Sequence, residues 1–90
     1  MTGIGIRIKE LREEKELTMD MLVTDMNFKF SDLKLNKSML SRWEKGLNDP
    51  SLEYAKYLSL YFDVSVDYLI GITDVKTPSR LLAIKNKKVR

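Results

Sequence analysis

Hydrophobic side chains recur along this chain at intervals of three and four residues, which is the spacing of amphipathic helices. The positions of Ile4, Ile8 and Leu11 predict a first helix over residues 4–16. Thr18 is a favoured N-cap residue and precedes a second apolar stripe. That stripe predicts a second helix from residue 19, with an inner side made of Met19, Leu22, Val23 and Met26.

The segment over residues 36–46 has the start and stop signals of a third helix. Asn36 is a favoured N-cap residue, and Gly46 suits the left-handed position that follows a helix. Leu35 and Leu40 have the spacing of a hydrophobic staple. At 100° per residue, the predicted inner side holds Met39, Leu40, Trp43 and Leu47. The predicted outer side carries no carboxylate and holds Lys37, Ser38, Ser41, Arg42 and Lys45.

Two more helices are predicted in the second half of the chain. Ser51 can cap a helix that runs to about Phe62. This helix is predicted to bury Leu52, Ala55, Leu58 and Phe62. Ser65 can cap a short helix over residues 66–70, which Gly71 ends. Five short helices joined by tight turns predict an all-α fold.

Two segments allow alternative interpretations. Residues 28–34 either extend the second helix as far as Phe30 or form a loop that packs Phe28, Phe30 and Leu33 against the domain. Residues 79–88 form either a weakly amphipathic sixth helix or a frayed tail.

Ninety residues, of which 43% are hydrophobic and 32% charged, are enough for one small globular domain. We assign residues 1–75 to this domain and residues 76–90 to a basic C-terminal tail. No apolar run approaches the roughly 20 residues that span a bilayer, and the first residues lack the pattern of a signal peptide. We therefore expect a cytoplasmic protein with no membrane partner, and the absence of cysteine agrees with that compartment.

The sequence offers little for catalysis, because it contains neither cysteine nor histidine. Zinc sites and nucleophiles activated by imidazole are thereby excluded. Ser41 and Lys45 lie one helical turn apart, but nothing around them predicts the enclosed pocket of a catalytic dyad. Four carboxylates are interpreted as solvated surface groups: Glu13, Glu14, Asp20 and Asp25. We expect no enzymatic activity, no metal and no cofactor.

The net charge of +3 comes from 16 basic and 13 acidic residues, and it is unevenly distributed. The first 75 residues contain 10 bases and 13 acids. After Asp74 there is no acid, and six bases follow: Lys76, Arg80, Lys85, Lys87, Lys88 and Arg90. DNA binding by the domain must therefore depend on locally placed cations, while the tail adds non-specific attraction to phosphates. The outer side of the predicted helix 37–45 provides such a local group of cations and suits a DNA major groove. The alternative is a solvated surface helix.

In four places the sequence resembles the Cro and lambda-repressor-like helix-turn-helix regulators, also called the XRE family. The similar segments are IGIRIKELREEKELT at 4–18, LNKSMLSRWEKG at 35–46, DPSLE at 49–53 and DVSVDYLIG at 63–71. The resemblance implies a five-helix domain that binds a palindromic operator as a dimer, with residues 37–45 as the recognition helix. It also implies that Trp43 and Glu44 pack this helix on the fourth helix. DNA contacts are implied at Asn36, Lys37, Ser38, Ser41, Arg42, Lys45 and Asn48.

Two features depart from the family pattern. Family members commonly begin the second helix with glutamine, whereas Met19 stands here and offers an apolar contact to DNA but no hydrogen-bond donor. Residues 28–34 look like an insertion in a turn that is normally tight. Such an extension resembles some repressors of phages of Gram-positive bacteria, which suggests a phage or prophage origin.

Our first hypothesis is a sequence-specific regulator of transcription that forms a weak homodimer on double-stranded DNA, with repression as the expected direction of regulation. Its dimer surface is expected near Tyr68, Ile70, Ile72 and Val75. The alternative is a protein-interaction module, or an antitoxin-type regulator, that binds a partner protein through the tail and Tyr57, Leu60 and Ile70. The acid-free outer side of the third helix favours the first hypothesis.

Overall fold

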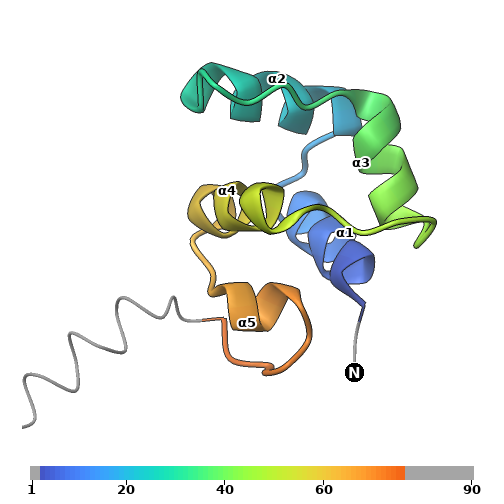
Figure 1. The fold of residues 1–90 in the computed structure, drawn as a ribbon, viewed down its shortest axis with the longest axis vertical. Coiled ribbons are helices and arrows are strands. Elements are labelled where there is room, and N and C mark those ends of the chain that lie inside the picture. The colour runs from blue at the N-terminus through green and yellow to red at the C-terminus, as the bar shows by residue number, and fades with distance from the viewer. Residues whose placement is uncertain (1–2, 77–90) are drawn as a thin grey trace, which may run out of the picture.

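The computed structural model describes residues 3–76 and contains five helices in that part of the chain (Figure 1). They are α1 (Ile4–Glu14), α2 (Met19–Lys29), α3 (Lys37–Glu44), α4 (Leu52–Phe62) and α5 (Val66–Leu69). The all-α fold is confirmed. The segment predicted at 79–88 and all but the first residue of the basic tail lie outside the described residues.

Side-chain caps begin four of these helices at the residues that the sequence predicts. Thr18 and Asn36 each accept a backbone N–H of the first turn through a side-chain oxygen, at 3.1 and 2.9 Å. Ser51 and Ser65 cap α4 and α5 in the same way, at 3.3 and 2.9 Å. Gly46 has a φ of 75°, which is the left-handed conformation expected after α3.

One hydrophobic core joins the five helices. Figure 1 shows α1 and α4 in the middle of the molecule, α2 and α5 on opposite sides of them, and α3 running down one flank. The core is centred on six fully buried side chains: Ile8, Leu22, Met26, Leu40, Leu58 and Leu69. Among the described residues, no helix has both the length and the apolar composition that crossing a bilayer requires.

Two leucines that were predicted to face the core are exposed. Leu47 is 69% exposed, because the left-handed Gly46 turns the chain away and ends the helical periodicity on which the prediction rested. Leu52 is 73% exposed. It is the first residue of α4 and stands at the rim of an open hollow, where no neighbouring helix covers it.

The segment over residues 28–34 combines the two alternatives. Helix α2 continues as far as Lys29. Beyond it, Leu33 is buried and Phe30 packs against the core, as the loop alternative predicted. Phe28 does not pack inward, since 84% of its surface is exposed.

Candidate nucleic-acid interface

Helix α3 lies directly against the first turn of α1. A Cβ added to Gly5 would overlap the carbonyl oxygen of Trp43, so only glycine permits this approach of the two helices. Trp43 also contacts α4, where its ring centroid lies 5.3 Å from that of Tyr54. The role of Gly5 was missed at the sequence level, because a glycine within a predicted helix gives no sign of which neighbour it meets.

A buried ion pair fixes the C-terminal end of α3. Arg12 donates from Nε and Nη2 to the two carboxylate oxygens of Glu44, at 2.8 and 2.9 Å, and from Nη1 to the carbonyl of Leu17 at 2.7 Å. The Glu44 side chain is 3% exposed, and its hydrogen bonds raise the pKa of Arg12 above its usual value. The resemblance implied that Glu44 packs on α4, whereas its hydrogen-bond partner in the structure belongs to α1.

A second polar contact fixes the start of α3. Asn27 of α2 donates from Nδ2 to the carbonyl of Leu35 at 2.7 Å, and its Oδ1 accepts the N–H of Leu35 at 3.0 Å. Because Leu35 immediately precedes the N-cap Asn36, this pair of hydrogen bonds positions the first turn of α3. Asn27 was not predicted, since an asparagine inside a helical pattern gives no signal for a partner eight residues away.

Most of the predicted site residues lie on the open side of α3 and the turn after it. Those that are exposed are Asn36, Lys37, Ser38, Arg42, Lys45 and Asn48, and Ser41 is half-buried. The side-chain oxygen of Asn36 is used by the helix cap, so its amide NH₂ is the part left to bind a ligand. Met19 is partly buried and packs against the core, which leaves only a part of its side chain accessible.

Helix α3 itself contributes no carboxylate to this side, but a neighbouring helix does. Asp20, in the first turn of α2, brings its Oδ2 to 3.5 Å from the Nζ of Lys37. Helical periodicity within one segment could not show this, because the acid comes from a different helix. Within residues 3–76, no carboxylate forms an ion pair with Arg42 or Lys45.

Asp25 was interpreted as a solvated carboxylate, and its side chain is 41% exposed, but it also has partners within the protein. Its Oδ2 accepts the hydroxyl hydrogen of Tyr61 at 2.6 Å and lies 3.4 Å from the Nζ of Lys29. The hydrogen bond from Tyr61 lowers the pKa of Asp25 below its usual value, and Lys29 adds to the effect. Burial, together with Asp25, raises the pKa of Tyr61 to about 12. The contact joins α2 to α4.

Tyr68 cannot belong to an exposed dimer surface, because it is only 6% exposed. The guanidinium of Arg7 lies over its ring, 4.1 Å from the centroid. Arg7 also donates to Asp74 at 2.6 Å, and this bond raises the pKa of Arg7. The other three members of the predicted surface, Ile70, Ile72 and Val75, are exposed.

The comparison with known families agrees with this arrangement. The helix-turn-helix profile matches residues 31–69, which include α3, α4 and α5. The match assigns this segment of the chain to the helix-turn-helix family. The predicted resemblance is thereby confirmed.

Two helix-turn-helix relatives are regulators of transcription by name. One is YobD of Bacillus subtilis, an uncharacterised regulator, with 32% identity over 72 residues that cover 80% of this chain and 58% of YobD. The other is the activator BcrR of Enterococcus faecalis, with 30% identity over 78 residues that cover 82% of this chain and 35% of BcrR. The chain thus spans less than two thirds of either relative. No solved structure matches it significantly.

Proposed function

We propose that this helix-turn-helix chain binds double-stranded DNA in a sequence-specific way and regulates transcription. The observation that carries the proposal is the division of α3 into two sides. Its inner side is held by Gly5, Arg12 and Asn27, while its outer side presents cations and hydroxyls to solvent. A major groove admits one helix, and base edges there accept hydrogen bonds from such side chains.

The outer residues suit different parts of DNA. Arg42 is exposed and forms no ion pair with a carboxylate of residues 3–76, and its planar guanidinium can donate two hydrogen bonds to one guanine. Ser38 and Ser41 can donate to or accept from base edges and phosphates. Phosphate contacts are assigned to Lys37, Lys45, Asn48 and the amide of Asn36. Met19 is assigned only an apolar contact at the edge of the DNA interface.

A single helix of this length contacts only a few base pairs, which is too few to select one site in a genome. We therefore propose a weak homodimer on a palindromic operator, with half-sites about 34 Å apart. Its surface would be the exposed Ile70, Ile72 and Val75, next to the hollow that Ile4 and Leu52 line. Sedimentation of the native chain and of Ile72→Asp, each with and without operator, tests the surface. Unchanged assembly of Ile72→Asp on DNA would contradict it.

Repression is the proposed direction of regulation, and a promoter fused to a reporter gene tests it. Higher reporter output with the protein than without it would reverse that assignment.

A regulatory protein partner has a candidate surface along α4, where Leu52 and Leu60 are exposed beside Tyr57.

Selection of bound sequences from a random DNA pool tests the proposed function. The expected result is an enriched inverted repeat with half-sites about one helical turn apart. A pool without enrichment would contradict sequence-specific binding. Tight binding of one copy to a non-palindromic site would contradict the dimer.

A further inference from the structure

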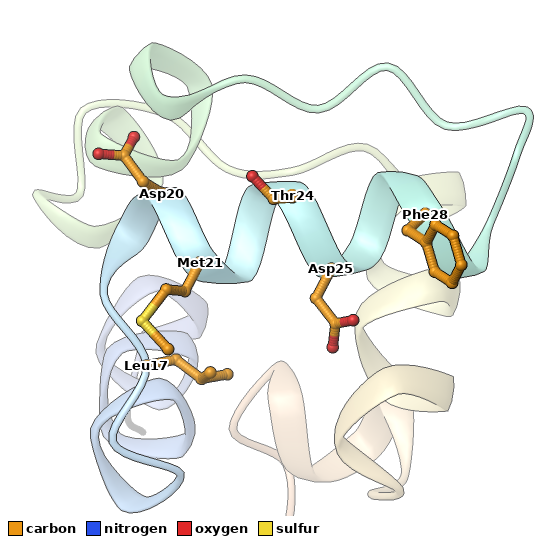
Figure 2. Close-up of a pocket in the computed structure, with 6 residues that line it drawn as sticks. All are labelled: Leu17, Asp20, Met21, Thr24, Asp25 and Phe28. Carbon is orange, nitrogen blue, oxygen red and sulfur yellow. The ribbon is translucent and has the colours of Figure 1, made fainter.

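Helix α2 is apolar on two sides, although only one of them faces the core. Leu22 and Met26 are fully buried on the inner side, whereas Met21 and Phe28 are 49% and 84% exposed on the outer side. The outer side is hollowed into a shallow groove lined by Leu17, Asp20, Met21, Thr24, Asp25 and Phe28, here called the α2 groove (Figure 2). Figure 2 shows Met21 pointing toward Leu17, with Phe28 at the other end of the helix.

The surroundings of the α2 groove are acidic. Residues 13–29, which include all of α2, contain five acids and two bases. Asp20 and Asp25 stand within the groove itself, and Asp25 is already bonded to Tyr61 and lies 3.4 Å from Lys29. The ion pair of Asp20 with Lys37 is exposed and 3.5 Å long, and pairs of that kind compensate little charge. A ligand that matches this groove carries apolar side chains, several cations and no acids.

Residues 77–90 of the same chain have this composition. They contain five bases and no acid, and their larger aliphatic side chains are Leu81, Leu82, Ile84 and Val89. Their charge is therefore opposite to that of the groove, and their apolar residues offer cover for Met21 and Phe28.

Lys76, the last described residue, is bound to the end of α1, from which the chain leads to the α2 groove. The carbonyl of Lys76 accepts the N–H of Ser65 at 3.1 Å, and its Nζ donates to both carboxylate oxygens of Glu14, at 2.8 and 2.9 Å. Glu14 precedes Leu17, one wall of the groove, by three residues. Leu81 and Leu82 follow Lys76 by five and six residues, which span about 15–20 Å when extended.

We propose that residues 77–90 bind the α2 groove of their own chain, with their aliphatic side chains against Met21 and Phe28 and their cations near Asp20 and Asp25. While they are bound there, these cations are withheld from DNA phosphates, so the groove and DNA compete for the same segment. This consequence rests on the proposed function, whereas the binding to the groove does not.

Disulfide trapping tests the binding directly, because the native chain has no cysteine. Thr24→Cys in the groove is combined with Leu82→Cys in the full chain. The matched control combines Leu82→Cys with Lys9→Cys, an exposed position on α1. Both proteins are oxidised at low concentration, and the intrachain disulfide is followed by mass. The groove pair is expected to close about tenfold faster, since binding raises the effective concentration of the two thiols.

Phe28→Ser in the groove pair removes an apolar contact without changing the charge and is expected to slow closure severalfold. Folding should not change, because Phe28 is exposed. Equal closure rates for the groove and control pairs would overturn the proposal. So would a groove pair that yields only disulfide-linked dimers, since the groove would then take the tail of a second copy. No slowing by Phe28→Ser would also count against it.

Non-specific DNA binding gives a separate measurement. Phe28→Ser is expected to release the segment and raise the affinity for random-sequence DNA severalfold at low salt, with a steeper salt dependence. If trapping succeeds but neither the native chain nor Phe28→Ser binds DNA, the proposed function fails and the groove assignment stands. If the native chain and Phe28→Ser bind random DNA with equal affinity, the competition between groove and DNA is contradicted.

Discussion

Helices α2 and α3 belong to the same helix-turn-helix unit, yet they use their outer sides in opposite ways. Helix α3 is apolar only toward the core and presents Lys37, Arg42 and Lys45 to solvent. Helix α2 is apolar on both sides and brings acids to its surface, among them Asp20. The first surface suits a polyanion, and the second suits a basic, apolar polypeptide.

The two helices also differ in how they are held. Helix α3 is fixed at both ends by polar contacts and by the close approach of Gly5 to Trp43. Helix α2 is held by the fully buried Leu22 and Met26, whereas its polar contacts with α4 involve the partly exposed Asp25 and Lys29, which both meet Tyr61. A recognition surface needs a defined orientation, and the contacts around α3 provide it. The comparison predicts that changes beneath α3 have larger effects than changes around α2.

The largest effect is expected from Arg12→Met. Glu44 would then be left buried without a partner, and loss of one member of a buried pair costs about 3–5 kcal/mol. Chemical denaturation measures the change, with Lys9→Met on the exposed side of α1 as the control. A loss below 1 kcal/mol for Arg12→Met would show that the pair does not hold α3.

Gly5→Ala is expected to be next in size. The added methyl group overlaps the carbonyl oxygen of Trp43, and overpacking of this kind costs about 1–3 kcal/mol. Because α3 must move away from α1, operator affinity is expected to fall further than the loss of stability explains. Gly3→Ala is the control, since a Cβ at Gly3 meets no atom within 4 Å. Equal effects of the two substitutions would contradict the close packing.

Tyr61→Phe tests how α2 is held, through the pH dependence of stability. Asp25 has a lowered pKa in the folded state, so its contribution is present above the usual value of 3.8 and is lost as the pH falls below it. Tyr61 has a raised pKa, so its contribution is complete below pH 10 and is lost as the pH rises toward 12. The advantage of the native chain over Tyr61→Phe in melting temperature should therefore shrink at both limits. A constant difference from pH 3 to pH 12 would refute the coupling.

The smallest effect is expected from Asp20→Asn, which removes the carboxylate beside Lys37. DNA binding should tighten by about 0.2–1 kcal/mol at low salt, because exposed charges of this kind interact weakly. Asp32→Asn, an exposed acid on the loop before α3, serves as the control. Unchanged binding by Asp20→Asn would place this part of α2 away from DNA, and weaker binding would contradict repulsion between Asp20 and DNA.

Much of the fold could be predicted from the sequence, because local signals determine it. The caps Thr18, Asn36 and Ser51 and the left-handed Gly46 lie where the pattern places them. The outer side of α3 also followed from its periodicity. Leu47 was misplaced because periodicity stops at a helix end.

Contacts between distant segments were beyond this reasoning. Arg12 and Glu44 are 32 residues apart, and Asp25 and Tyr61 are 36 apart. Separations of this length produce no periodic pattern in the sequence, and each side chain alone resembles an ordinary surface group. The same limit concealed Asp20 beside Lys37, because the two belong to different helices.

The central claim is that the outer side of α3 contacts bases through Arg42, and binding to a panel of operators tests it most directly. Each operator differs from the selected consensus at one base pair. Arg42→Ala is expected to lose about 1–3 kcal/mol on the consensus and to lose its preference at one position. Lys45→Ala, the matched control, should weaken binding to every operator alike, as a phosphate contact does. Unchanged affinity and preference for Arg42→Ala would contradict the assignment of α3 as the helix that recognises DNA.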